Sequence, residues 1–295
     1  MRQVITPDQM RQIEQAAFDA GTPSLDLMER ASQAVANTLI NMLGGARGKA
    51  AAFFCGVGNN GGDGFAAARL FAAQGGQAYI VLLDAPRTPD AKTNLRRAQQ
   101  MGIPIHETWP QGIQVDAAVD AIFGIGLNRP LEGKGAEAVR QLNALQIPVL
   151  AVDVPSGLDA LAGKSLGECV RAHHTITFHR AKTGHFLATN QEAIGELTIA
   201  DIGLTSPLEM QIMEALDGEN LARLLPVRPR ASHKGSNGRV LLYGGSMGMA
   251  GAAAMAALGC LRSGAGLVTM ACEENIIPIL QILVPNATCM PLSQV

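Results

Sequence analysis

Amide, carboxylate and glycine residues gather in the segment CGVGNNGGDG, residues 55–64. Its two amides, Asn59 and Asn60, can hydrogen bond a ligand, and its carboxylate, Asp63, can also transfer protons. Five glycines within residues 56–64 predict a flexible loop with exposed backbone N–H groups, rather than a packing device. An apolar run precedes the loop and an alanine-rich segment follows it. A strand, a glycine loop and a helix in that order predict a site for a nucleotide-like ligand, because N–H groups at a helix N-terminus bind phosphate.

Two later segments place oxygen-bearing side chains beside glycine. Residues 120–130 read DAIFGIGLNRP, and residues 152–159 read VDVPSGLD. Asp120, Asp153 and Ser156, with Asn60, offer carboxylate, hydroxyl and amide oxygens, which are the donors that hard cations prefer. A cation site is therefore one interpretation. Acidic residues at strand ends also cap the turn that follows, and the sequence leaves this alternative open.

Residues 56–61 also have the spacing GxGxxG, and Asp84 follows further along the chain. This is the pattern of dehydrogenases that bind a dinucleotide for hydride transfer. A carboxylate at Asp63 would repel the phosphates in such a loop, so we regard hydride transfer as the weaker alternative. A purely structural turn does not need the sequence Asn-Asn-Gly-Gly-Asp.

The histidines and Lys182 carry weaker signals. His173, His174, His179 and His185 lack the spacing of metal ligands, and the alternation in residues 174–179 predicts a strand with polar ends. Lys182 could reach an anionic ligand, but a solvated lysine is expected. The five cysteines form no CxxC pair, so we expect free thiols in a cytoplasmic protein and no zinc site.

Composition limits the classes of partner. The chain has 295 residues, 47% of them apolar and 16% charged, and this predicts a sizeable core. A net charge of −2 and an aromatic content of 4% argue against a nucleic-acid partner. No segment reaches the roughly 18–20 consecutive apolar residues of a membrane span, so no membrane partner is expected.

The elements that must position these residues alternate between strand and helix. Apolar runs predict strands at residues 50–55, 78–83, 117–123, 149–154 and 175–178, with helices at 64–74, 92–101 and 136–145. Two helices precede them, one capped by Thr6 and Gln9 and the other by Ser24. Alternation of this kind predicts an α/β fold with a mostly parallel sheet, whose ligands bind beyond the carboxyl ends of the strands.

The pattern breaks around residues 216–229, where prolines flank arginines. A second α/β unit with glycine-rich loops then begins, including a strand at residues 239–243 and a helix of small residues. We therefore divide the chain into a first domain at 1–215, a linker at 216–230 and a second domain at 231–295. The last part is short for an independent domain, and we expect a truncated one.

These segments resemble a known family. GxGNNGGDG at 56–64, DAIFGIGLNRP at 120–130 and VDVPSGLD at 152–159 are similar to the N-terminal domain of the bifunctional NAD(P)H-hydrate repair enzymes, over roughly residues 1–215. HKGSNGRVLLYGGS at 233–246 and RSGAGLVT at 262–269 resemble the start of the dehydratase domain of the same enzymes. The resemblance implies a Rossmann-like three-layer domain with a parallel sheet, followed by the start of a ribokinase-like α/β domain.

The resemblance implies that the first domain epimerises the R and S forms of the hydrated cofactors NADHX and NADPHX. It implies that potassium binds Asn60, Asp120 and Ser156, and that Asp153 faces the nicotinamide end of the substrate. From the chemistry of that reaction we assign proton transfer to Asp153, with Asp63 as the second candidate. The substrate-binding residues that it implies are Asn59, Asn60, Gly61, Gly62, Asp63, Gly124, Ile125, Gly126, Leu127, Asn128, Arg129, Pro130, Asp153 and Ala252. The preference between NADHX and NADPHX stays open, and a homo-oligomer is compatible with the sequence.

A complete dehydratase domain would use ADP or ATP to dehydrate the S form. In the resembling family its nucleotide loop and catalytic aspartate lie far downstream, and no such segment precedes Val295. We therefore expect epimerase activity from this chain and no ADP-dependent dehydration. We also expect Asp153→Asn to abolish epimerisation and to leave the fold largely intact. A binding or scaffold module of the same fold is the alternative from a different class.

Overall fold

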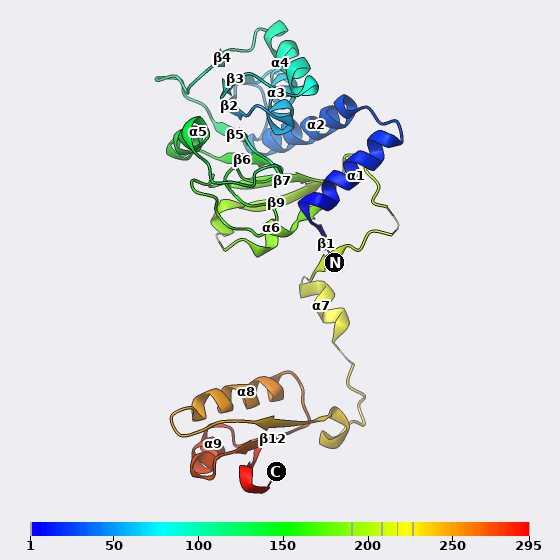
Figure 1. Cartoon of the computed structure of the whole chain (residues 1–295), viewed down its shortest axis with the longest axis vertical. Helices are drawn as coiled ribbons and strands as arrows, with labels where there is room; N and C mark the ends of the chain where they lie inside the picture. The colour runs from blue at the N-terminus through cyan, green and yellow to red at the C-terminus, as the bar shows by residue number, and fades with distance from the viewer. Residues whose placement is uncertain (1, 190, 208, 217, 226, 295) are drawn as a thin grey trace. The chain divides into compact units, whose positions relative to one another are not determined.

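The computed structural model describes residues 2–189, 191–207, 209–216, 218–225 and 227–294. The chain divides into two compact units, Met1–Asn220 and Leu221–Val295, and each is described by itself. Figure 1 traces the elements of both units in chain order. No helix among the described residues is both long and apolar enough to cross a membrane.

The first unit is built around a parallel sheet of seven strands in the order β4-β3-β2-β5-β6-β7-β9. Its strands are β2 (Ala50–Cys55), β3 (Gln77–Leu82), β4 (Ile105–His106), β5 (Ala117–Ala121), β6 (Val149–Val152), β7 (His174–Phe178) and β9 (Glu196–Ala200). From β2 the chain builds outward to β3 and β4, and then returns to place β5 on the other side of β2. This reversal opens a crevice between the carboxyl ends of β2 and β5, which is where open α/β sheets bind ligands.

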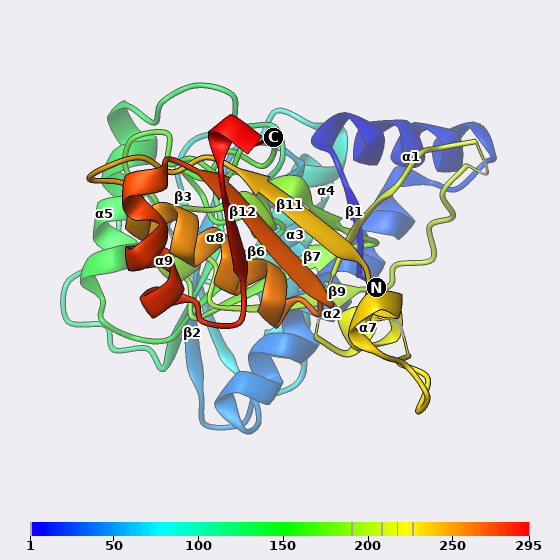
Figure 2. The ribbon, with the colours of Figure 1, turned by 90° about the horizontal axis from the view of Figure 1, so that it is seen from below.

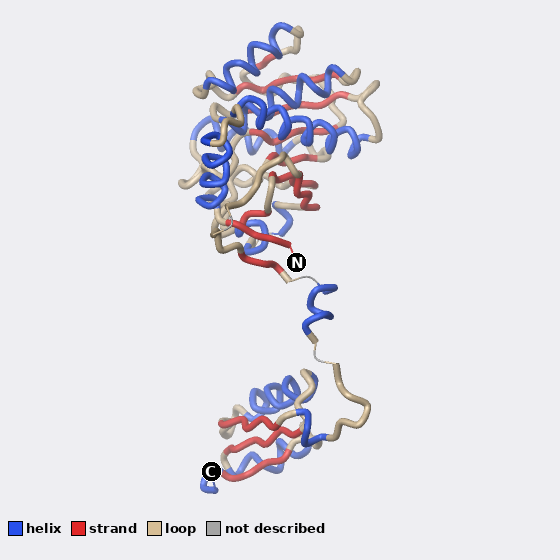
Figure 3. Tube along the Cα trace, turned by 90° about the vertical axis from the view of Figure 1, so that its right-hand side faces the viewer, coloured by secondary structure: helices blue, strands red, loops and turns tan. Residues whose placement is uncertain are grey.

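Helices cover both faces of this sheet. The helices are α1 (Pro7–Asp19), α2 (Ser24–Leu43), α3 (Asn59–Ala73), α4 (Pro89–Gln100), α5 (Gly133–Ala144) and α6 (Thr183–Leu187). Along β2, Phe53 faces the core formed with α1 to α4, whereas Phe54 faces the core formed with α5. Burial on both faces explains why the strands read as continuous apolar runs, and Figure 3 shows the strands in red among the blue helices.

The structure has a strand or helix at each of the predicted ranges, but the first and last residues of several elements differ. The strand at 50–55 is confirmed to the residue, whereas those predicted at 117–123 and 149–154 end two residues earlier. Thr6 caps α1 and Gln9 completes the capping box, as predicted. Ser24 does not cap α2, because the N-cap is Pro23 and Ser24 is the first helical residue.

The prediction for the glycine segment was wrong, because α3 begins at Asn59 and not at residue 64. Gly61, Gly62 and Gly64 lie inside the helix and serve packing. A Cβ on Gly61 would lie 1.9 Å from the carbonyl oxygen of Gly56, and one on Gly64 would lie 2.6 Å from the Cβ of Ala121. The absence of side chains therefore lets the first turns of α3 rest directly on the ends of β2 and β5.

A small second sheet pairs the first strand of the chain with two strands from much later in the sequence. Strand β1 (Arg2–Ile5) runs parallel to β8 (Ala181–Lys182) and antiparallel to β10 (Met213–Ala215). In this register Ile5 lies opposite Lys182.

The second unit has a parallel sheet in the order β11-β12-β13, with its own apolar core. Its strands are β11 (Arg239–Tyr243), β12 (Leu267–Cys272) and β13 (Thr288–Pro291), and its longer helices are α8 (Ala250–Arg262) and α9 (Ile277–Leu283). Figure 2 shows β11 and β12 in front of α8. The segment predicted as a linker contains a helix, α7 (Gly218–Leu224), so it is not extended throughout.

Candidate functional site

A cavity of about 460 Å³ opens at the carboxyl ends of β2 and β5, a size that suits a small-molecule site. Its wall comes from α1, from the β2–α3 and β5–α5 connections, and from the ends of β6, β7 and β8. The lining residues are Met10, Arg11, Glu14, Val57, Gly58, Asn59, Asn60, Asp63, Thr88, Ile122, Phe123, Gly124, Ile125, Gly126, Leu127, Asp153, Phe178 and Lys182.

The cavity brings together many of the residues that the sequence singled out. Those that line it are Asn59, Asn60, Asp63, Gly124, Ile125, Gly126, Leu127 and Asp153. Gly61 and Gly62 are buried in α3 and do not line it, and the N–H of Gly62 donates to the carbonyl of Gly58. Asn128, Arg129 and Pro130 are exposed beyond the wall. Ala252 is exposed on α8 of the second unit. The binding roles of all these residues stay predictions.

The N-terminus of α3 faces the cavity without a side-chain cap. Gly58, the N-cap, has an extended backbone and forms no capping hydrogen bond. The N–H groups of the first helical turn have no partner further back in the helix, and they carry the positive end of the helix dipole. On the same wall, Nδ2 of Asn60 and Oγ1 of Thr88 form no hydrogen bond within the described protein. These groups suit a ligand with negative charge and hydrogen-bond acceptors.

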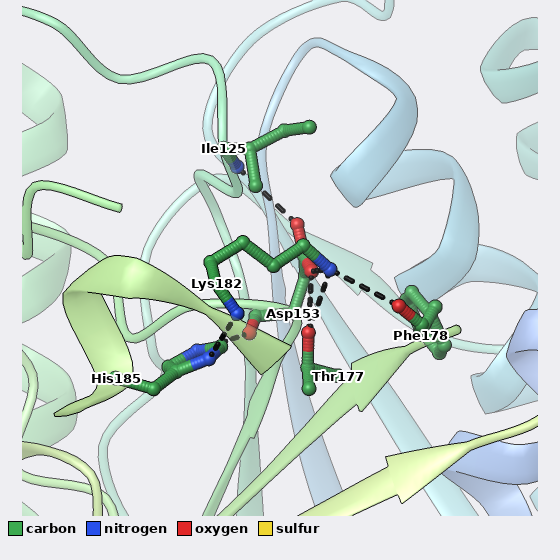
Figure 4. A network of polar contacts seen from close by, with 6 residues as sticks. All are labelled: Ile125, Asp153, Thr177, Phe178, Lys182 and His185. Atoms are coloured by element: carbon green, nitrogen blue, oxygen red, sulfur yellow. Dashed lines mark hydrogen bonds and ion pairs between the residues drawn. The ribbon is translucent and has the colours of Figure 1, made fainter. Parts of the chain in front are cut away.

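The deepest polar feature of the wall is an ion pair between Asp153 and Lys182. Nζ of Lys182 lies 2.8 Å from Oδ1 of Asp153, and it also donates to Oγ1 of Thr177 at 2.8 Å and to the carbonyl of Phe178 at 3.2 Å. Thr177 in turn donates to Oδ1 of Asp153 at 2.9 Å. Figure 4 shows the carboxylate of Asp153 between Lys182 and the backbone of Ile125. The side chain of Lys182 is fully buried, so the prediction of a solvated lysine was wrong.

Asp153 also has an unusual backbone. Its φ of 66° lies in the left-handed region, which aspartate adopts more readily than most residues but still at a cost. The backbone N–H of Asp153 donates to the carbonyl of Ile176 at 2.7 Å. Its second carboxylate oxygen, Oδ2, accepts a hydrogen bond from the backbone of Ile125 at 3.3 Å, on the cavity wall. Strained backbone of this kind recurs at functional sites.

The two catalytic candidates have pKa values displaced in opposite directions. Burial raises the pKa of Asp153, but Lys182, His185 and Thr177 together lower it by more than burial raises it. The pKa of Asp153 therefore lies below its ordinary value. The pKa of Asp63 lies well above its ordinary value, because of burial and because of repulsion from Asp153, Glu14 and Asp90. Burial and repulsion by Asp153 also raise the pKa of Glu14. The wall therefore presents an ionised Asp153 beside carboxyl groups that favour the protonated form.

Asp120 and Ser156 lie behind the wall in direct contact. Oγ of Ser156 donates to Oδ1 of Asp120 at 2.6 Å, and the backbone N–H of Ser156 donates to Oδ2 at 2.7 Å. The backbone of Ile122 also donates to Asp120 at 3.2 Å, so the carboxylate organises this turn. Asp120 is fully buried and forms no ion pair among the described residues. Burial is the main reason that its pKa rises to about 6, despite the hydrogen bonds that lower it.

Other predicted features lie away from the cavity wall. Asp84 is exposed, accepts a hydrogen bond from the backbone of Ala85 and does not line the cavity. No cluster of three or more acidic, histidine or cysteine side chains suited to a metal ion occurs among the described residues. Among the four histidines, only His185 touches the Asp153 network.

Sequence reasoning missed Glu14, Arg11 and the buried state of Lys182. Glu14 lies one helical turn after Met10, on the same apolar face of α1. A carboxylate on an apolar helix face is a pattern in the sequence that could have indicated a functional residue. Arg11 forms an ion pair with Asp8 and donates to the carbonyl of Ile125 at 3.1 Å. Its position depends on contact with a segment distant in sequence, which no local pattern reveals.

Comparison with known proteins agrees with this architecture. Residues 24–184 match the family model described as YjeF-related protein N-terminus, and residues 240–295 match the model described as NAD(P)H-hydrate dehydratase. The crystal structure of yeast ynu0 has a similar fold, with a TM-score of 0.59 and 22% identity over 72% of this chain and 99% of that protein.

Two curated relatives illustrate the similarity in sequence. The bifunctional NAD(P)H-hydrate repair enzyme of Moorella thermoacetica is 34% identical, over 99% of this chain and 58% of the relative. The enzyme of the same name from Escherichia coli is 35% identical, over 92% of this chain and 54% of the relative. The chain thus spans little more than half the length of these relatives. By its match over residues 24–184, this chain belongs to the family of the YjeF-related protein N-terminus.

Proposed function

We propose that the first unit is an epimerase that interconverts the R and S forms of NADHX and NADPHX, the hydrated nicotinamide cofactors. The single observation that carries this proposal is the cavity at the switch point, where Asp153, ion-paired with Lys182, and Asp63, whose pKa lies well above its ordinary value, line the same cavity as an uncapped helix N-terminus. The name of the curated relatives, bifunctional NAD(P)H-hydrate repair enzyme, supports the same substrate.

Ligand binding follows from the charges on the wall. The phosphates of a dinucleotide suit the positive N-terminus of α3, where Gly58, Asn59 and Asn60 line the cavity. Arg11 of α1 adds a cationic side chain to the lining. The reactive ring would then lie where Asp153, Lys182 and Asp63 line the cavity.

The chemistry requires one acid and one stabilising anion. The carbon to be inverted carries a hydroxyl group next to the ring nitrogen. In our proposal protonated Asp63 gives its proton to that hydroxyl, the C–O bond breaks with release of water, and the nitrogen lone pair forms an iminium cation. Asp153, held ionised by Lys182, stabilises that cation. Water then adds to the opposite face and returns a proton to Asp63, so that atoms and charge balance.

In this proposal Asp63 donates the proton and Asp153 stabilises the cation. The expectation from sequence ranked Asp153 first as the proton carrier. Nζ of Lys182 has all its hydrogen bonds occupied by Asp153, Thr177 and Phe178, which favours Asp153 as a fixed anion. The raised pKa of Asp63 suits a group that donates a proton.

A potassium ion fits the residues behind the wall. Asp120 is a buried carboxylate without a cationic partner among the described residues, and Ser156 adds a hydroxyl oxygen. Oγ of Ser156 accepts from the backbone of Phe123, and a Cβ on the next residue, Gly124, would lie 3.1 Å from Oδ1 of Asn60. Asn60, Asp120 and Ser156 would hold the ion, which would supply positive charge that fixes the 122–124 segment in place.

A chiral chromatographic assay of R- and S-NADHX exchange tests the function. We expect the protein to accelerate exchange, and we expect slower exchange when potassium is replaced by lithium at equal ionic strength. The Asp63→Asn variant is the matched control, because it keeps the shape of the cavity and removes the acid. Exchange at the same rate with and without the protein would refute the proposal.

A further inference from the structure

His185 joins the backbones of the two charged residues of the site. Its Nδ1 atom lies 3.0 Å from the backbone nitrogen of Lys182, and its Nε2 atom lies 3.0 Å from the carbonyl oxygen of Asp153. The side chain is 3% exposed and comes from α6, the short helix that follows Lys182. In Figure 4 the imidazole ring lies on the far side of Asp153 from Ile125.

These two contacts determine where the ring carries its proton. The backbone N–H of Lys182 is a donor, so Nδ1 must accept and cannot carry hydrogen. The carbonyl of Asp153 is an acceptor, so Nε2 must donate. The imidazole is therefore neutral, with its proton on Nε2. Burial, and then the charge of Lys182, lower the pKa of His185 to about 4, which agrees with a neutral ring at pH 7.

We propose that His185 is a positioning residue, which holds Asp153 in its left-handed conformation and in register with Lys182 through this pair of hydrogen bonds. The proposal rests on the epimerase function of the same site. His185 does not line the cavity, so it acts through Asp153 and Lys182 and not on the substrate.

The helix that carries His185 is itself tightly placed. A Cβ on Gly184 would lie 2.4 Å from the carbonyl oxygen of Asp159 and 2.6 Å from that of Ala160. The N–H of Gly184 donates to the carbonyl of Ala160 at 2.8 Å. The imidazole thus has a rigid support, and its two hydrogen bonds transfer that rigidity to Asp153.

Loss of the two His185 hydrogen bonds should change the pH dependence of kcat on its acid side. The charged group that acts on Asp153 is Lys182, since the His185 ring is neutral, and Asp153 in turn raises the pKa of Asp63 from α3 and Glu14 from α1. If Lys182 moves away from Asp153, the pKa of Asp153 rises toward its ordinary value. The ionised form of Asp153 is then lost at a higher pH than in the unmodified protein.

The first test reads the histidine directly and does not depend on any enzymatic activity. In ¹⁵N-edited NMR of the full chain at pH 7, we expect His185 to show the neutral tautomer with hydrogen on Nε2. In ¹³C NMR we expect the Asp153 carboxyl group to titrate below the usual range. A tautomer with hydrogen on Nδ1, or an imidazolium at pH 7, would overturn the proposal even if the protein proved to have another substrate.

The second test compares two substitutions. His185→Gln keeps an acceptor and a donor at similar positions, whereas His185→Phe fills the space and leaves the N–H of Lys182 and the carbonyl of Asp153 without partners. We expect His185→Phe to lower kcat about 10- to 100-fold with little change in KM, since small displacements of a reacting group have effects of this size. The acid limb of its kcat profile should move up by about 1 pH unit, as expected when an opposite charge is partly lost. His185→Gln should restore most of kcat and the position of the acid limb.

His174→Phe is the matched control. His174 begins β7, whereas Phe178 at the other end of the strand lines the cavity. The His174 side chain is partly buried, and its Nε2 atom lies 2.8 Å from Oγ1 of Thr198. Its replacement therefore removes a partly buried histidine away from the cavity. We expect an unchanged acid limb for this variant. A merely structural role would lower activity equally at all pH values, and an unshifted acid limb in folded His185→Phe would contradict the proposal. If His185→Phe fails to fold, a folded His185→Gln protein whose kcat is lowered about 10- to 100-fold, or the absence of the Nε2 tautomer in the unmodified protein, would contradict the proposal.

Discussion

At the scale of single residues, the site depends on a charge that the protein has buried. Lys182 is fully buried, and its ammonium group is balanced by Asp153 and two neutral acceptors. A buried ion pair contributes little net stability, but removal of one partner leaves an uncompensated charge in the interior. Substitutions here therefore change stability and chemistry together, and experiments must separate the two effects.

Asp153→Asn is expected to abolish exchange and also to destabilise the first unit by about 3–5 kcal/mol, because Lys182 loses its counter-charge. This revises the expectation from sequence that the fold would remain intact. Asparagine tolerates the left-handed backbone of Asp153, so the cost is electrostatic. The double variant Asp153→Asn with Lys182→Met should recover most of the stability and none of the activity. Urea unfolding and the exchange assay measure the two quantities, and a single variant as stable as the unmodified protein would contradict the prediction.

Asp63→Asn should change the pH dependence of stability. The folded pKa of Asp63 is raised, whereas the unfolded value is about 3.9, so the unmodified protein loses stability as pH rises from about 4 toward the folded value. The asparagine variant lacks this loss, so its free energy of unfolding should increase relative to the unmodified protein over that window. Exchange should fall by about 10²- to 10⁴-fold. Parallel stability curves between pH 4 and 8 would show that Asp63 is not held in its protonated form.

At the scale of elements, the glycines of α3 show how a motif can be recognised for the wrong reason. The segment at 56–64 was correctly connected with a helix N-terminus, but its glycines were assigned to flexibility. Three of them lie within α3: Gly61 and Gly64 allow close approach to Gly56 and the strand ends, and Gly62 allows close approach to Met28 of α2 and Ala91 of α4. The sequence shows that these positions have no side chain, but it does not show which neighbouring atoms lie where each Cβ would be.

Gly61→Ala distinguishes packing from flexibility. In an ordinary helix interior, alanine is about 1 kcal/mol more favourable than glycine. Here the added Cβ would lie 1.9 Å from backbone, so we expect destabilisation by about 1–3 kcal/mol or more, and reduced exchange. Gly58→Ala is the control for stability, because a Cβ there meets nothing within 4 Å and its φ of −98° is ordinary. Unfolding midpoints in urea measure both variants, and a Gly61→Ala protein more stable than the unmodified one would refute the packing role.

Much of the first unit could be predicted because its strands are buried on both faces and bounded by polar loops. The five predicted strands all exist, and the family resemblance is confirmed by the match over residues 24–184. The short strands β1, β8 and β10 could not be predicted, because their pairing joins residues about two hundred positions apart. The burial of Lys182 is a consequence of that pairing, so it was also invisible in the local sequence.

At the scale of the whole molecule, the two units have separate apolar cores. The core of the second unit comes from α8, β12 and α9, whereas every residue that lines the candidate site lies between positions 10 and 182. Changes in the second core therefore offer a way to test whether the site is complete within the first unit.

Met270→Ala should destabilise the second unit by about 2–5 kcal/mol, since Met270 is 1% exposed in that core. The rate of R/S exchange should stay unchanged at temperatures at which the first unit is folded. Hydrogen exchange read by mass spectrometry would locate the loss of protection, and the chromatographic assay would give the rate. A fall in exchange rate without loss of protection in residues 1–220 would show that the second unit contributes to activity.

The pairing of β1 with β8 has a consequence for the order of events during synthesis. Val4 leaves the ribosome early, but its partners Ala181 and Met213 are made much later. At translation rates of about 5–20 residues per second, this strand must wait roughly 10–40 s for its neighbours. Most strands of the seven-stranded sheet precede Lys182 in the sequence, and β8, which carries Lys182, is the strand that pairs with the waiting β1 opposite Ile5. The first unit therefore completes the candidate site late in its own synthesis, after most of the sheet around it has been made.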